Sequence, residues 1–173
     1  RFLRPSVRLF CPAADRHLVS SFYKYPQRSN ANCYQQIGVL RRNSLGRIAS
    51  QVGDHIVVYT RRGKSAESWL PALAATHNRV LVYGFGGTEK IGNIEFCAID
   101  NQRFLNDLAT CKALITTAGN QLVGEALNLG KPVLAIPEHG NFEQEINGHF
   151  LDESGFGRTL KAQHVSCHKV LEF

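Results

Sequence analysis

A strand that runs through a glycine into a helix is the feature of this sequence best suited to binding a phosphate. The apolar run Ala113–Thr116 predicts a strand, and Asn120–Leu129 has the apolar spacing of a helix. Thr117 adds a hydroxyl at the turn, and Gly119 has no Cβ to hinder a phosphate. The start of a helix offers unpaired N–H groups and about half a positive charge, the combination that a diphosphate requires.

Glu125 follows Gly119 by six residues, in the second turn of the predicted helix. A carboxylate there could reach the ribose of a nucleotide whose phosphate lies at the helix start, and it could accept both ribose hydroxyl protons. The alternative is an ordinary strand–helix turn, in which Thr116 and Thr117 cap the helix and Glu125 lies on the surface. The spacing alone leaves both possibilities open.

A second polar loop follows the next predicted strand. It begins after Pro137 and leads into a helix that contains Glu143, Gln144 and Asn147. A carboxylate beside an amide suits the hydroxyls of a sugar. The alternative is an acidic first turn that only complements the helix dipole.

Short strands alternate with helices from residue 53 onward, which predicts an α/β fold. The expected strands are His55–Thr60, Arg79–Tyr83, Ile94–Ile99, Ala113–Thr116 and Pro132–Ile136. The expected helices are Ala66–Thr76 with Ser65 as its cap, Gln102–Thr110, Asn120–Leu129 and Phe142–Glu153. The pattern is typical of a Rossmann-like parallel sheet with helices on both faces. Ligands of such sheets bind at the carboxyl ends of the strands, here the loops after Thr60, Thr117 and Pro137.

The composition divides the chain into three parts. Residues 1–50 lack a sustained period and predict an interdomain connection or the remnant of a missing amino-terminal domain; 51–160 form the binding domain, and 161–173 a tail. The net charge is +6, and most early charges are basic. That excess favours either a surface for anionic membrane lipid or phosphate, or a merely solvated segment. The aromatic-interleaved pattern of a nucleic-acid partner does not occur.

The cysteines and the hydropathy indicate a cytoplasmic protein. The five cysteines contain no C-x-x-C pair, and Cys97 and Cys111 lie in apolar context as buried thiols. There is no apolar run of about 18 residues that would span a membrane. His164, Cys167 and His168 lack a second ligand pair at usable spacing, so no metal site is expected.

The segment from Thr116 to Asn147 resembles the carboxyl-terminal half of the GT-B glycosyltransferases. The shared order is a strand, Thr-x-x-Gly, a helix with a glutamate, Leu-Gly-Lys-Pro, a strand ending in proline, and Glu-Gln-x-x-Asn. The likeness covers residues 53–157 and is strongest to the bacterial family that transfers N-acetylglucosamine from UDP to lipid I, and to uncharacterised relatives of it.

The resemblance implies roles for individual residues. Gly119, Asn120 and Gln121 would hold the diphosphate, and Glu125 the ribose. The loop that contains Arg61 would face the diphosphate, the stretch Ile99–Phe104 would lie near the base, and Glu143 and Gln144 would bind the donor sugar. The predicted substrate-binding residues are Arg61, Thr117, Gly119, Asn120, Gln121, Glu125, Glu143, Gln144 and Asn147.

Several positions depart from the family pattern and put the identity of the donor in doubt. Leu122 replaces a hydroxyl residue, Asn141 an acidic residue, and Gly148 an alanine, and the usually glycine-rich first loop is basic. Gly84-Phe85-Gly86 begins like a dinucleotide fingerprint, but Glu89 stands at its sixth position and no helix is expected to follow.

We therefore expect the donor domain of a glycosyltransferase that binds a nucleoside-diphosphate sugar, a UDP-sugar, without metal or cofactor. The sequence contains no Asp-x-Asp for a metal-bridged diphosphate, and a helix dipole with arginines would take the place of the ion. No general base is evident, since His139 fits a solvated loop, and the acceptor site would belong to the missing domain. The alternatives are a UDP-sugar epimerase of the same architecture and a non-catalytic nucleotide-sugar-binding module.

Overall fold

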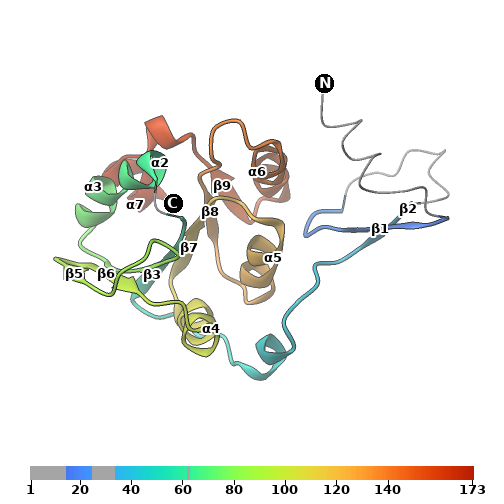
Figure 1. The fold of residues 1–173 in the computed structure, drawn as a ribbon, viewed down its shortest axis with the longest axis horizontal. Coiled ribbons are helices and arrows are strands. Elements are labelled where there is room, and N and C mark those ends of the chain that lie inside the picture. The colour runs from blue at the N-terminus through green and yellow to red at the C-terminus, as the bar shows by residue number, and fades with distance from the viewer. Residues whose placement is uncertain (1–14, 25–33, 62) are drawn as a thin grey trace.

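A seven-stranded sheet forms the centre of the molecule in the computed structural model, which describes residues 15–24, 34–61 and 63–173. The strand order is β5-β6-β4-β3-β7-β8-β9 (Figure 1). The strands are β3 (His55–Tyr59), β4 (Arg79–Tyr83), β5 (Lys90–Ile91), β6 (Ile94–Cys97), β7 (Ala113–Thr116), β8 (Val133–Ala135) and β9 (Gly157–Thr159). All neighbours are parallel except β5 and β6. The predicted parallel α/β sheet is confirmed.

The chain reverses its direction of travel across the sheet between β3 and β7. The chain passes from β3 to β4 and β6 on one side, and then from β7 to β8 and β9 on the other. Tyr59 at the end of β3 lies beside Thr116 at the end of β7. The carboxyl ends of two such strands border a crevice, which is where ligands of open α/β sheets bind.

Helices cover both faces of the sheet because the strands are apolar on both sides. Val57, Leu81 and Leu114 pack with α4, α5 and α6, whereas Val58 and Val82 pack with α2, α3 and α7. The helices are α2 (Lys64–Glu67), α3 (Leu70–Ala74), α4 (Asn101–Thr110), α5 (Asn120–Asn128), α6 (Phe142–Ser154) and α7 (Cys167–Glu172), with 3₁₀ turns at Asn43–Arg47 and Ala162–His164. Cys97 and Cys111 are buried free thiols, as expected.

The single helix expected over Ala66–Thr76 is wrong, because the segment forms α2 and α3 separately. Pro71 lies in the first turn of α3. Proline has no N–H and its ring collides with the carbonyl four residues earlier, so one helix does not continue through it. Ser65, expected as the cap, lies inside α2.

The segments before and after the domain pack against it. β1 (His17–Ser20) and β2 (Tyr34–Ile37) form a separate parallel pair that extends from the side of α5 and α6 (Figure 1). Residues 161–173, expected as a tail, contain α7, which packs against α3 and buries Val170. Within the described ranges, no helix combines the length and the apolar character needed to cross a membrane.

Candidate functional site

Helix α5 begins at the crevice with its first amides uncapped. Its N-cap is Gly119, and no side chain of the described residues caps this end of the helix. The first helical bond runs from the N–H of Val123 to the carbonyl of Gly119 at 3.0 Å. The backbone N–H groups of Asn120, Gln121 and Leu122 precede that bond and point out of the helix end. A protein cap on these groups would have argued against a phosphate site.

The space in front of Gly119 is open. A Cβ built on this glycine would meet no atom within 4 Å, and its φ of −65° suits any residue. Neither packing inside the protein nor backbone conformation therefore requires glycine at this position. Free approach of a ligand remains as a physical reason for it.

The residue before this glycine has a strained backbone. Ala118 has a φ of 65°, the left-handed region that residues with a Cβ rarely adopt. The buried Asn147 donates from Nδ2 to the carbonyl oxygen of Ala118 at 2.9 Å and holds the turn in place. Strain of this kind is concentrated at functional sites. The amide of Asn147 thus supports the loop, while its predicted contact with substrate stays a prediction.

Glu125 is completely buried on α5 and is held by donors from the protein. Its Oε1 accepts from the backbone N–H of Arg42 at 3.2 Å, from Nε of Arg42 at 3.0 Å and from Nε2 of Gln121 at 3.4 Å. Its Oε2 accepts from Nη2 of Arg42. Burial raises the pKa of Glu125, but the bonds from Arg42 and Gln121 outweigh it, so the pKa lies below its usual value and the group is ionised.

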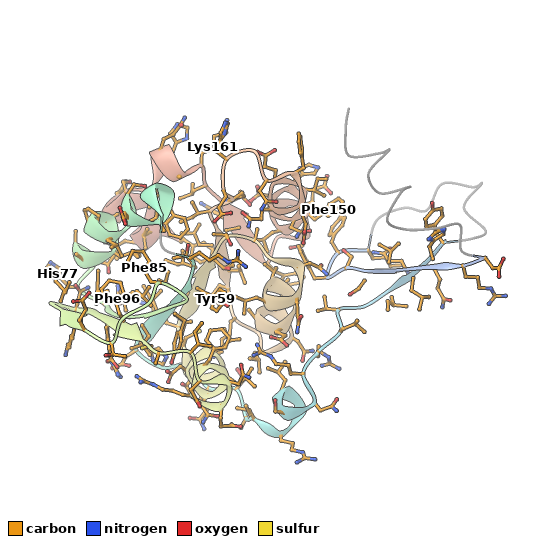
Figure 2. The ribbon with its side chains drawn as sticks, viewed as in Figure 1. Tyr59, His77, Phe85, Phe96, Phe150 and Lys161 are labelled. Carbon is orange, nitrogen blue, oxygen red and sulfur yellow. The ribbon has the colours of Figure 1, made fainter. Side chains whose placement is uncertain are left out.

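Glu125 lines a cavity of about 250 Å³ at the carboxyl edge of the sheet. The cavity is also lined by Arg42, Tyr59, Tyr83, Ile99, Asn101, Phe104, Gln121 and Leu122. Figure 2 labels Tyr59, whose ring meets Phe104 edge to face at 5.4 Å. The predicted ribose residue and the stretch expected near the base therefore share one pocket with aromatic walls.

A cluster of charged residues holds Tyr83, which lines this pocket. The hydroxyl of Tyr83 donates to Asp107, and Arg103 pairs with both Asp107 and Glu95. Burial, and then the bond to Asp107, raise the pKa of Tyr83 well above its usual value. Tyr83 is thus a neutral donor, fixed in place, and it does not serve as a base.

Polar side chains in the first turn of α6 bond to the backbone of the same turn and of the loop before it. Asn141 caps α6 by accepting from the N–H of Gln144 at 3.3 Å, and Oε1 of Gln144 accepts from the N–H of Glu138 at 2.8 Å. Glu143 is exposed. The bond from Asn147 to Ala118 brings this turn beside the loop before α5. The two polar loops are therefore adjacent, although neither Glu143 nor Gln144 lines the pocket of Glu125.

The first loop follows β3 at the same edge of the sheet. The N–H of Thr60 donates to the carbonyl of Tyr83 at 3.1 Å, and Arg61 is exposed beside it. Arg62 lies outside the described residues. The segment after Gly84 leads into β5, so the dinucleotide-like glycines are not followed by a helix.

Sequence reasoning missed three pocket residues: Arg42, Tyr59 and Tyr83. The tyrosines end predicted strands, so the rule that places ligands at the carboxyl ends of strands could have found them. Arg42 belongs to the segment read as a connection, and no spacing pointed to its partner. Among the described residues, no group of three or more His, Cys, Asp or Glu is placed to hold a metal ion.

Comparison with known proteins identifies the family. The profile described as "Glycosyl transferase family 1" matches residues 2–173. The chain belongs to glycosyl transferase family 1. An uncharacterized glycosyltransferase of Methanosarcina mazei is 37% identical over 62 residues, which make up 34% of this chain and 16% of that protein.

Solved glycosyltransferases share the fold of this family member. The glycotransferase of kitacinnamycin superposes with a TM-score of 0.63 at 16% identity, over 91% of this chain and 45% of its own. LpCGTa, solved in complex with UDP, gives a TM-score of 0.54 at 22% identity, over 83% of this chain and 39% of its own. The chain thus has the α/β fold of one half of a GT-B glycosyltransferase and spans less than half the length of these proteins.

Proposed function

We propose that this chain is the donor-binding part of its glycosyltransferase and binds a UDP-sugar for metal-independent transfer to an acceptor. The observation that supports this most is the uncapped start of α5, which opens at the crevice between β3 and β7 beside the pocket of Glu125. A helix start, a carboxylate and aromatic walls suit a diphosphate, a ribose and a base respectively.

Each part of the donor has a place in this arrangement. The amides of Asn120, Gln121 and Leu122 would bind the diphosphate, Thr117 would lie beside it, and Arg61 would approach it from the loop after β3. Glu125 would bind the ribose, and the rings of Tyr59 and Phe104 would contact the base. Glu143 and Gln144, at the neighbouring start of α6, would bind the sugar.

The chemistry requires stabilisation of the leaving group. In glycosyl transfer the sugar becomes cationic as negative charge grows on the departing diphosphate. Backbone N–H groups at a helix start and the cation of Arg61 would stabilise that charge. The acceptor site and the general base would come from the rest of the protein. The specific donor that we propose is a UDP-sugar like that of the N-acetylglucosamine transferases.

Gly119→Ala tests the diphosphate site with little structural disturbance. The added methyl group meets no protein atom, so the melting temperature should stay unchanged. UDP affinity, measured by calorimetry on the full chain, should fall about tenfold or more, because hydrogen bonds to a charged group contribute roughly 1.5–3 kcal/mol each. Uridine affinity should change little.

Gly38→Ala is the matched control, since a Cβ there also meets nothing within 4 Å. Its UDP affinity should equal that of the wild type. Equal UDP affinity of Gly119→Ala and the wild type would refute the proposed diphosphate site.

A further inference from the structure

Described residues between positions 20 and 42, which precede the domain, contact α5, the helix that we propose for nucleotide binding. Four residues of α5 make these contacts: Asn120, Gly124, Glu125 and Asn128. Val39 lies so close to Gly124 that a Cβ there would meet its Cγ2 at 2.3 Å. The carboxylate of Glu125, a predicted donor contact, is therefore already engaged by the chain itself, whereas Asn120 is engaged only through its side chain.

Arg42 makes the most extensive of these contacts, and it fills the acceptor sites of Glu125. Oε1 receives the backbone N–H and Nε of Arg42 together with Gln121, and Oε2 receives Nη2 of Arg42. A carboxylate accepts about four hydrogen bonds, so little capacity is left for two ribose hydroxyls. Glu125 is also 0% exposed, and a ligand does not reach its carboxylate while Arg42 stays in place.

Arg42 borders solvent, whereas Glu125 does not. The side chain of Arg42 is 30% exposed, whereas that of Glu125 lies within the packed helix. The guanidinium stands 5.5 Å from the centre of the Phe104 ring, inside the pocket. Because its side chain already borders solvent, a rotation of Arg42 away from Glu125 would uncover this ring while Glu125 stayed in place.

We propose that Arg42 is a gate on the ribose site: it occupies Glu125 in the empty protein, and a nucleotide must displace it to bind. The inference rests on the proposed function, since it concerns the same pocket. The apparent affinity is then the intrinsic affinity multiplied by the fraction of molecules in which Arg42 is displaced.

Arg42→Ala tests the gate because it predicts a gain, which general damage does not produce. UDP affinity of the full chain, measured by calorimetry, should rise about tenfold, the effect of removing a gate that is open in about one molecule in ten. Arg41→Ala is the control, because Arg41 bonds to Asn128 and does not line the pocket. Its affinity should match that of the wild type.

Arg42→Lys guards against loss of folding, since removal of Arg42 leaves a buried carboxylate unpaired. Lysine keeps the charge but does not form the bidentate contact, so UDP affinity should lie above that of the wild type. If the folded Arg42 variants bind UDP no more tightly than the wild type, while Arg41→Ala binds it normally, the gate is overturned and the proposed function stands. Absence of UDP binding in the wild type and all variants overturns both the gate and the proposed function.

Discussion

At the scale of single residues, Glu125 combines a structural and a proposed binding role. Its carboxylate is buried, and its charge is balanced by Arg42 from a segment that joins the domain at its edge. A buried ion pair contributes little net stability, but loss of one partner is costly because the other charge is left buried. Glu125 therefore needs a partner in the folded protein; that partner is Arg42 here and would be the ribose in the proposed complex.

The lowered pKa of Glu125 sets a direction for stability against pH. A carboxylate whose folded pKa lies below its unfolded value of 4.5 contributes its full stability above that value. The contribution is lost as the pH falls through the lower, folded pKa. We predict that Glu125→Gln reduces the free energy of unfolding by about 1–3 kcal/mol at pH 7, measured with urea.

The same measurement at pH 3 supplies the contrast. Below the unfolded pKa of 4.5 the contribution is progressively lost, so the difference between the two proteins should be smaller at pH 3 than at pH 7. A difference of the same size at both values of pH would show that the ion pair with Arg42 contributes no pH-dependent stability.

The sequence reveals those residues of the site that belong to one local unit of structure. Gly119 and Glu125 were predictable because a strand, a glycine and a helix fix their spacing within one local unit. Arg42 was not, because its bond to Glu125 joins residues 83 apart, and one sequence contains no signal for such a pair. Part of the pocket is therefore predictable from the local sequence pattern, and part depends on tertiary contacts that the pattern does not contain.

At the scale of elements, the start of α5 depends on α6. Asn147 on α6 holds Ala118 in its left-handed conformation, and that turn points the first amides of α5 at the crevice. We predict that Asn147→Ala weakens UDP binding on calorimetry by about tenfold, while the free energy of unfolding falls by only about 1–3 kcal/mol, the effect of one lost buried hydrogen bond.

Ser154→Ala is the control on the same helix. Its hydroxyl donates to the carbonyl of Leu151 at 2.7 Å, at the end of α6 away from the crevice. It should lose some stability and keep its UDP affinity. Unchanged UDP affinity in Asn147→Ala would separate the conformation of Ala118 from binding.

The strands that were predictable share one property. Arg79–Tyr83 and Ala113–Thr116 are runs that are buried from their second residue onward and are mainly apolar there, and the structure places both strands as expected. β9, with the sequence Gly-Arg-Thr, has no such run and exists because it pairs with β8. A Cβ on Gly157 would lie 2.3 Å from the carbonyl oxygen of Val133, a close approach that only the folded sheet reveals.

At the scale of the whole molecule, the chain spans only part of the solved glycosyltransferases whose fold it shares. It covers 45% of the kitacinnamycin glycotransferase and 39% of LpCGTa. We predict that the 173-residue chain binds UDP but transfers no sugar from a UDP-sugar to any acceptor, because the acceptor site is proposed to lie in the rest of the protein. Chromatography of the products, with and without a longer version of the protein, checks this. Transfer by the chain alone would contradict the assignment of the acceptor site to other parts of the protein.

The proposed function depends on binding of a nucleotide's diphosphate by the start of α5. Amide-resolved NMR during titration of the full chain with UDP tests it most directly, with uridine as the comparison. We expect UDP to shift the amide signals of Asn120, Gln121 and Leu122 strongly. Uridine should shift signals around Glu125 and Phe104 but leave those three nearly unchanged. Saturable UDP binding that leaves the three amides unmoved would contradict it.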